Sequence, residues 1–312
     1  MARFWILAFS VLGAVLAGCA GPAPDHSRSA EGAPERLLII SATGAEFEAV
    51  ARRVENPVVN EIGPSVAVEG RVGAVHVVAL HSGVSIVNAA MTTQWALDTY
   101  PVRAIIVSGT AAGLDPDLGI GDVVIAEQWG KYNEMFFLRE ADGPPPTMSP
   151  LGRPLTFAPF DFMAPREARP LPSASGASEE QFWFPIDQEL SDLARRTASD
   201  IILAPCFADE ICVDRTPEVR FAEAGVSGSV FMDNIAFGTY LRETFGASIL
   251  EMETAAIAIV ARANGVPFIA VRSISDRVQP APPGDHEYIN YHPLAAENAA
   301  RVAVGLVVAI DP

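Results

Sequence analysis

The sequence has few cysteines and few basic residues, and both shortages limit what the protein can be. Only Cys19, Cys206 and Cys212 occur in its 312 residues, with no CxxC pair and no cysteine–histidine cluster, so we expect no metal. Lys and Arg number 21 against 38 Asp and Glu, which gives a formal net charge of -17. Because such a surface repels phosphate backbones, we do not expect nucleic acid as a partner.

Long apolar runs are also missing, except near the N-terminus. Residues 4–16 form an apolar run behind Arg3 that is too short to span a bilayer comfortably but fits the core of a signal peptide. The motif Leu16-Ala17-Gly18-Cys19 resembles the bacterial lipoprotein signal, which is cut before a cysteine that then carries the lipid. The alternative is a plain secretory signal in which Cys19 plays no part.

The segment after this signal is rich in Pro, Ala, Gly and Ser, a composition typical of a flexible tether. We therefore predict a signal peptide at 1–18, a tether at 19–35 and a folded domain at 36–312. We expect an exported, periplasm-facing lipoprotein of the cell envelope that meets the membrane only through its N-terminal lipid. In such oxidising surroundings Cys206 and Cys212 can form a short-loop disulfide, with two buried thiols as the alternative.

The body of the chain has enough apolar residues for a full core, since half of the sequence is hydrophobic. Apolar runs and helical spacings alternate along it. Strands are expected at 37–40, 65–68, 74–80, 104–107, 122–126, 225–230, 248–250 and 266–273, and helices at 46–54, 85–97, 188–198, 254–264 and 295–310. This order predicts a single α/β domain with a mixed, mainly parallel central sheet flanked by helices. A Pro-rich insertion near 140–180 interrupts it and is either functional or mobile.

Three acidic residues fall where strands of this sheet are expected to end. Glu46 follows the strand at 37–40 across a turn, Glu253 opens a helix after the strand at 248–250, and Asp276 follows the strand at 266–273. Ligands of open α/β sheets collect beyond the carboxyl ends of the strands. Each acid alone is explained as a solvated charge or a helix cap. Together, and with a small-residue loop expected at 108–113, they indicate a carboxylate-based site.

Several motifs occur in one order along the chain, namely Ser41-Ala42-Thr43-Gly44-Ala45-Glu46, His81-Ser82-Gly83-Val84, Ser108-Gly109-Thr110-Ala111-Ala112-Gly113, Gly121-Asp122-Val123-Val124, Val226-Ser227-Gly228, Glu251-Met252-Glu253-Thr254-Ala255-Ala256 and Arg272-Ser273-Ile274-Ser275-Asp276. From about residue 37 to the C-terminus, the chain resembles the nucleoside phosphorylase/nucleosidase superfamily. Its closest resemblance is to the 5′-methylthioadenosine/S-adenosylhomocysteine nucleosidases. The resemblance implies a nucleoside phosphorylase-like fold and a homodimer.

The resemblance also implies how the three acids share the chemistry. Asp276 matches the acid that protonates N7 of a purine, so burial should raise its pKa. Glu46 matches the carboxylate that activates the attacking water, and Glu253 the group that binds the ribose hydroxyls, with Met252 packed on the sugar. An acid on the base side and a base on the water side is the arrangement of an inverting glycosidase.

The remaining matches line or support the same site. Arg272 and Ser275 match residues that orient the acid's segment, Phe231 and Met232 match residues at the purine, Thr110, Ala111 and Val84 would line the pocket, and Glu251 aligns with a further sugar-side acid. Core packing is an alternative explanation for each of them. Ser229 departs from the family, which usually has an aspartate there.

These features favour hydrolysis of the N-glycosidic bond of purine nucleosides such as methylthioadenosine or S-adenosylhomocysteine, with release of the free base and no cofactor. A phosphorylase is the first alternative, but residues 106–108 and 41–45 lack the arginines that would hold phosphate. A non-catalytic envelope protein that binds nucleosides is the second. It would have no need of a water-activating acid such as Glu46.

Overall fold

The computed structural model describes residues 34–140, 142–170, 180–280 and 286–310. The predicted signal peptide at 1–18, Cys19 and the tether as far as residue 33 lie outside these ranges. The lipoprotein signal and the export therefore stay predictions. The homodimer stays a prediction as well.

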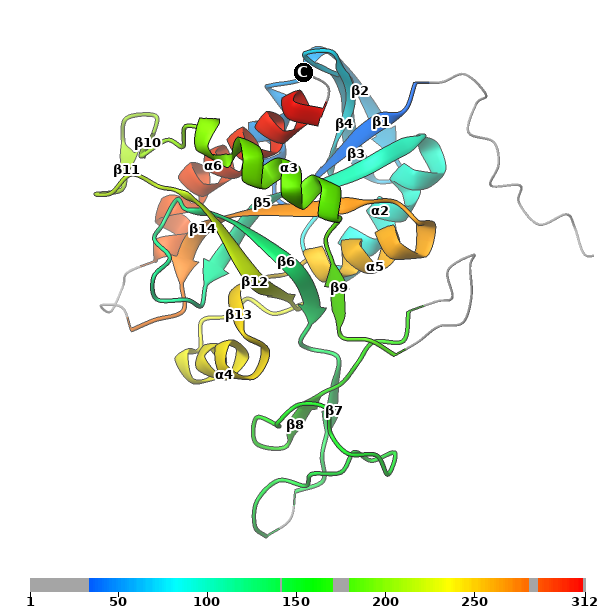
Figure 1. Ribbon diagram of the computed structural model, residues 1–312, viewed down its shortest axis with the longest axis vertical. Coiled ribbons are helices and arrows are strands. Elements are labelled where there is room, and N and C mark those ends of the chain that lie inside the picture. Colours follow the sequence, from blue (N-terminus) through cyan, green and yellow to red (C-terminus); the bar gives the residue numbers. More distant parts are fainter. Residues whose placement is uncertain (1–33, 141, 171–179, 281–285, 311–312) are drawn as a thin grey trace, which may run out of the picture.

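The centre of the protein is one large sheet (Figure 1). Its ten strands are β1 (Arg36–Ser41), β2 (Glu55–Ile62), β3 (Ser65–Val72), β4 (Val75–His81), β5 (Val102–Gly113), β6 (Val123–Lys131), β9 (Trp183–Pro185), β12 (Val219–Ser227), β13 (Ala247–Glu251) and β14 (Phe268–Arg277). They lie in the order β13-β12-β6-β14-β5-β1-β4-β3-β2, with β9 paired to β6. Residues 37–40 of β1 are all buried, as expected for an apolar strand covered on both faces.

Parallel pairs form the middle of the sheet. β1 runs parallel to β4 and β5, β14 to β5, and β12 to β6 and β13, while β2, β3 and β9 add antiparallel pairs at the edges. β13 also pairs antiparallel with β5, so β13, β12, β6, β14 and β5 close into a ring. The predicted mixed α/β sheet is confirmed, and its closure brings the ends of β13, β14 and β5 together.

Helices flank this sheet in two groups. They are α1 (Gly44–Ala51), α2 (Ile86–Thr99), α3 (Gln188–Thr197), α4 (Ile235–Phe245), α5 (Thr254–Asn264) and α6 (Glu287–Ile310). α6 packs on β14 and β5 together with α1 and α3, and α2 packs with α5. Among the described residues α6 is long and apolar enough to cross a membrane, and 61 % of that apolar window is buried. Its apolar surface is therefore explained by core packing.

Several expected element boundaries were wrong. The small-residue loop at 108–113 is the end of the continuous strand β5, because these residues are buried between β14 and β13. The strand expected at 225–230 is β12, which ends at Ser227, and β14 extends to Arg277 and so contains Asp276. α6 begins at Glu287 rather than at 295, with Pro293 inside it.

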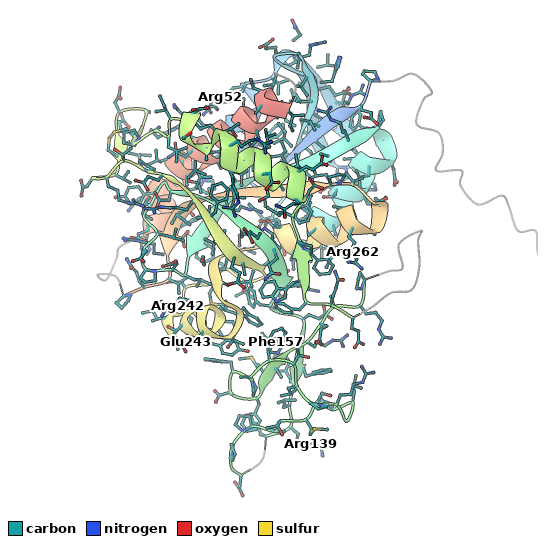
Figure 2. The ribbon with its side chains drawn as sticks, in the orientation of Figure 1. Arg52, Arg139, Phe157, Arg242, Glu243 and Arg262 are labelled. Atoms are coloured by element: carbon teal, nitrogen blue, oxygen red, sulfur yellow. A yellow bond between two sulfur atoms is a disulfide. The ribbon has the colours of Figure 1, made fainter. Side chains whose placement is uncertain are left out.

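The Pro-rich insertion has little regular structure of its own. It carries the short pair β7 (Met135–Phe137) and β8 (Met163–Pro165), and residues 171–179 lie outside the described ranges. Its aromatic side chains pack on α4 and build a second core with Phe157, Phe160, Phe182, Trp183, Phe237, Tyr240 and Phe245. Figure 2 shows Phe157 where the insertion meets α4. Burial of these rings holds the insertion on the main body.

Cys206 and Cys212 form a disulfide that joins β10 (Cys206–Phe207) to β11 (Ile211–Cys212), a small hairpin next to α6. Of the two possibilities for these cysteines, the structure has the bonded one.

We expect the double variant Cys206→Ser/Cys212→Ser to lose about 2 kcal/mol of unfolding free energy, because a short disulfide loop still restricts the unfolded chain. Urea unfolding measures this loss. The matched control is the unaltered protein with and without reductant, whose difference should equal the effect of the substitutions. An unchanged urea midpoint in both comparisons would show that the hairpin holds without its bond.

Candidate active site

One pocket lies at the carboxyl ends of β1, β5, β13 and β14. It is lined by every sequence-predicted site residue of the body except Arg272, namely Glu46, Val84, Thr110, Ala111, Phe231, Met232, Glu251, Met252, Glu253, Ser275 and Asp276. The three acids singled out from strand ends therefore share one cavity. Among the other lining residues, Thr43 belongs to a motif already noted in the sequence, whereas Tyr288 was not indicated by it; the two complete the side near α1 and α6.

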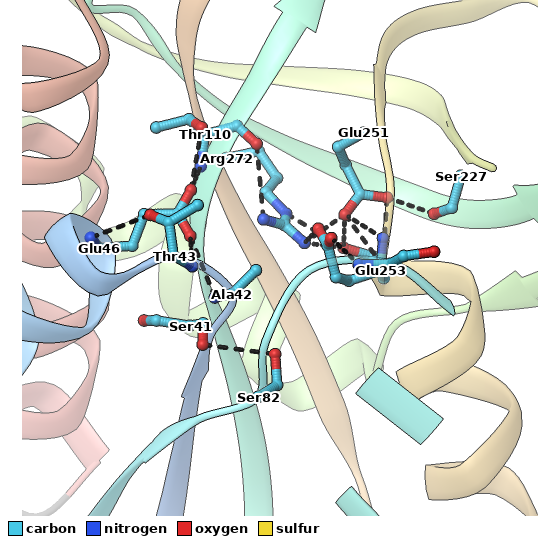
Figure 3. A network of polar contacts seen from close by, with 12 residues as sticks. Ser41, Ala42, Thr43, Glu46, Ser82, Thr110, Ser227, Glu251, Glu253 and Arg272 are labelled. Carbon is cyan, nitrogen blue, oxygen red and sulfur yellow. Dashed lines mark hydrogen bonds and ion pairs between the residues drawn. The ribbon is translucent and has the colours of Figure 1, made fainter. Parts of the chain in front are cut away.

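Glu46 is held by four hydrogen-bond donors (Figure 3). It lies in the first turn of α1, where Thr43 and Glu46 form a capping box. Oε2 accepts from the backbone N–H of Ala42 at 3.0 Å and of Thr43 at 2.9 Å. Oε1 accepts from the N–H of Thr110 at 2.7 Å and from its hydroxyl at 2.9 Å. These donors stabilise a charged carboxylate in a fixed orientation at the cavity wall.

Arg272 lies beneath the pocket and connects two other glutamates. It is 1 % exposed, pairs with Glu251 and places Nη2 3.5 Å from Oε2 of Glu253. These contacts join Arg272 to the segment of Glu251 and Glu253, and its predicted role of orienting the segment of Asp276 stays a prediction. Gly109 is its register partner on β5, and this glycine leaves room for the guanidinium to extend toward β13.

Glu251 uses its carboxylate to hold the protein chain. It accepts hydrogen bonds from Ser227 Oγ, from the N–H of Glu253 at 3.0 Å, from the N–H and hydroxyl of Thr254 at 3.0 Å, and from Arg272. Both of its oxygens therefore have protein partners. Although Glu251 reaches the pocket, these contacts fix the junction of β13 and α5 rather than leave an oxygen free for a ligand.

Glu253 has fewer hydrogen-bond partners than Glu251: Oε1 accepts one backbone hydrogen bond, and Oε2 lies 3.5 Å from Arg272. It occupies the N-cap position of α5 without capping it, and Oε1 accepts from the N–H of Ser85 at 2.7 Å. Burial, and then the charge of Glu251, raise the pKa of Glu253, while Arg272 opposes them. The hydroxyl of Ser85 lies 2.8 Å from that of Ser229, the position where the sequence departs from its family.

Asp276 occupies the far end of the pocket. The register between β14 and β5 shifts between Ile274 and Asp276, and such a bulge redirects side chains at the end of a strand. Ser275 donates a hydrogen bond to Oδ1 of Asp276 at 2.6 Å. Burial raises the pKa of Asp276 to about 6, against the lowering effect of the Ser275 hydrogen bond. The carboxyl group therefore holds its proton at far higher pH than an exposed aspartate does.

The first turns of α6 add aromatic and imidazole groups that strand-end reasoning missed. The ring of Tyr288 packs edge-on against Phe231, with centroids 5.2 Å apart, and is tilted against the ring of His292, with centroids 4.9 Å apart. Burial raises the pKa of the Tyr288 hydroxyl, and the charges of Glu46, Asp276 and Glu253 raise it further. Tyr288 therefore lies near all three acids. A sequence signal for it would have required the true start of α6.

The insertion contributes a second cavity beside the first. Phe137, Phe160 and Met163 line it, and it shares residues 230–232 with the pocket of the three acids. Phe231 is 59 % exposed between the two cavities. The segment after β12 thus serves as a wall for both. Within the described ranges, no three His, Cys, Asp or Glu side chains gather as metal ligands would.

We expect Gly109→Ala to destabilise the fold by about 1–3 kcal/mol, because overpacking a buried site forces its neighbours to move. An added Cβ would lie 3.0 Å from Oε1 of Glu46 and closer still to Nη1 of Arg272. Gly113→Ala on the same strand is the matched control, since its nearest neighbour would be 3.5 Å away, at Cγ of Arg277. Urea unfolding of both variants tests this, and equal stabilities would contradict the packing of Arg272 against Gly109.

Comparisons with known proteins agree with this geometry. Residues 36–308 match the Phosphorylase superfamily. The chain is 29 % identical over 244 residues to the 5'-methylthioadenosine/S-adenosylhomocysteine nucleosidase of Chromohalobacter salexigens, covering 77 % of this chain and 84 % of that protein. It is also 24 % identical over 225 residues to bark storage protein B of Populus deltoides, covering 66 % of this chain and 67 % of that protein.

Solved structures show the same fold. The 5'-methylthioadenosine/S-adenosylhomocysteine nucleosidase of Neisseria meningitidis, in complex with methylthio-immucillin-A, has a TM-score of 0.65 and 22 % identity, covering 88 % of this chain and 99 % of that one. The futalosine hydrolase of Helicobacter pylori has a TM-score of 0.62 and 19 % identity, covering 88 % of this chain and 97 % of that one. Because the family match extends over the whole sheet and every acid of the pocket, this chain belongs to the Phosphorylase superfamily.

Proposed function

We propose that the protein hydrolyses the N-glycosidic bond of purine nucleosides, with methylthioadenosine-like nucleosides as the first substrates to test. The observation that carries this proposal is the single pocket in which Asp276, Glu46 and Glu253 occupy separate walls in different electrostatic surroundings. Relatives named as nucleosidases support the substrate class. Each of the three acids in this pocket can be assigned one role in the reaction.

Asp276 is the group suited to act on the leaving base. Its buried carboxyl has a pKa of about 6, so it can donate a proton near neutral pH. Protonation of N7 lets the purine leave as a neutral molecule rather than as an anion. Ser275 keeps the carboxyl oriented through its hydrogen bond to Oδ1.

Glu46 and Glu253 are suited to the sugar side. Glu46, fixed by four donors, would receive a proton from the attacking water, while Glu253 would bind the ribose hydroxyls and Met252 would pack on the sugar. The developing oxocarbenium charge at the sugar is stabilised by nearby carboxylate charge. Acid and base on opposite sides of the scissile bond produce inversion at C1′.

Water is favoured over phosphate as the nucleophile. No Lys or Arg is among the described residues that line the pocket. The buried guanidinium beneath it, Arg272, is already engaged by Glu251 and Glu253. A phosphate dianion would lose its hydration here without gaining a cationic partner, which is costly.

We expect Asp276→Asn and Glu46→Gln each to lower kcat by about 10²–10⁴-fold, because each removes one general acid or base. Free base is measured chromatographically after incubation with a nucleoside panel. Asp98→Asn is the matched control, since it removes an exposed carboxylate on α2 that does not line the pocket.

The same assay separates the alternatives. Turnover in phosphate-free buffer supports hydrolysis, whereas a requirement for phosphate would establish a phosphorylase. Ligand binding with no release of base from any nucleoside would make the protein a non-catalytic binder. Full activity of Asp276→Asn would show that another group protonates the base.

The pH dependence follows from the sign of the shift at Asp276. The reaction needs the protonated carboxyl, so kcat/KM should fall tenfold per pH unit above about 6, the pKa of Asp276 in the free enzyme. Asp233→Asn removes one of the charges that raise this pKa, so its profile should shift to lower pH. Initial rates across a buffer series measure both midpoints. If the midpoint of the descending limb were the same in Asp233→Asn as in the unaltered protein, this would argue against Asp276 as the acid.

A further inference from the structure

His292 lies behind Glu46 and outside the lining of the pocket. It comes from α6, and its side chain is 12 % exposed. Nε2 lies 3.3 Å from the hydroxyl oxygen of Thr43 and 3.8 Å from Oε1 of Glu46. The imidazole therefore lies within ion-pair distance of the carboxylate, although it does not line the cavity.

The hydrogen bonds of Thr43 fix where the proton of this imidazole sits. The Thr43 hydroxyl oxygen accepts the N–H of Glu46 at 3.3 Å within the capping box, so its own hydrogen is free to be donated. The acceptor that lies within reach is Nε2 of His292. When the hydroxyl donates to Nε2, this nitrogen carries a lone pair and the proton of the neutral ring is on Nδ1, which is the tautomer that proton uptake at Nε2 requires.

Glu46 itself has no lone-pair direction to spare. A carboxylate offers about four acceptor directions, and Ala42, Thr43 and the two donors of Thr110 already use four. A proton taken from water by Glu46 would displace one of these donors. The carboxylate therefore recovers its charged, fully bonded form only when that proton moves on to another base.

We infer that His292 is this base: a positioning and proton-accepting residue that returns Glu46 to its carboxylate form in each turnover. The inference rests on the proposed hydrolysis. It assigns a role to a side chain that does not touch the substrate.

The proton balance of the step is closed. The water oxygen bonds to C1′ while the bond from C1′ to N9 breaks, and the electron pair of that bond goes to the base, whose N7 receives the proton of Asp276. The water proton passes to Glu46. The Thr43 hydroxyl then turns away from Nε2 of His292, and the ring closes the 3.8 Å that separate Nε2 from Oε1 and takes the proton, becoming an imidazolium. Solvent afterwards removes a proton from His292 and returns one to Asp276, so both groups are reset.

Burial, rather than the charged groups around it, favours the neutral ring of His292 before turnover. Burial lowers the pKa of His292, and the charge of Glu46 opposes that effect. Farther along the contact between α1 and α6, Arg52 and Arg53 pair with Glu297, and at the start of α6 Arg277 pairs with Glu287. In the described part of the chain, Glu46 is therefore the charged residue that acts on the imidazole without being paired to Lys or Arg.

We expect His292→Gln to lower kcat by on the order of 10²-fold with little change in KM, because glutamine can accept the Thr43 hydrogen bond but cannot take up a proton. The unaltered protein should lose activity at low pH as His292 becomes protonated, and this limb should move to lower pH in His292→Gln. Imidazole added to His292→Ala should restore part of kcat. His76→Gln, at the opposite end of β4 from the pocket, is the matched control for loss of a histidine.

A spectroscopic readout keeps this inference apart from the proposed function. In ¹⁵N-labelled protein near pH 7.5, long-range ¹H–¹⁵N spectra should show an unprotonated Nε2 and a protonated Nδ1 for His292. A proton on Nε2 would overturn the inference whatever the enzyme does. If the unaltered protein is active and His292→Gln keeps the full kcat and an unchanged low-pH limb, the inference is overturned and the proposed hydrolysis stands. If the unaltered protein releases no base, the proposed function itself is overturned.

Discussion

The buried ion pairs of Arg272 are the constraint on which the rest of the site depends. Two glutamates brought out of water, one at the end of β13 and the other two residues later at the N-cap of α5, would repel each other, and each would lose its hydration. One guanidinium between them allows both to stay. The guanidinium in turn needs the empty space above Gly109, so the backbone of β5 at this point has no room for a side chain. Cation, glycine and carboxylates therefore form one unit that must be assembled together.

The pocket separates three chemically similar acids by their surroundings. Glu46 is surrounded by donors that favour its charge, whereas burial dominates at Asp276 and raises its pKa. Glu253 lies between these cases, since Arg272 offsets part of the cost of its burial. Different environments for similar carboxyl groups are how a single fold provides both an acid and a base at one pH.

The sequence predicted the elements that are periodic and strongly apolar, and with them the strand ends that carry Glu46, Glu253 and Asp276. It failed where burial came from distant parts of the chain. The segment around Gly109 has small residues that suggest a loop, and only its contacts with β13 and β14 make it a strand. The start of α6 was missed because Pro293 and the preceding Pro-rich stretch hide the helical spacing, and Tyr288 was missed with it. The reach of Arg272 toward β13 depends on ring closure, which no local pattern encodes.

The shared wall at residues 230–232 has a consequence for how such a protein can diverge. On one side lie the acids, fixed by a network that tolerates little change. On the other lies the insertion, anchored by aromatic packing that accepts many apolar combinations. Mutations in the insertion can therefore reshape the outer boundary of the pocket while the reactive groups keep their positions. Selection for a new substrate and preservation of the old chemistry need not compete for the same amino acids.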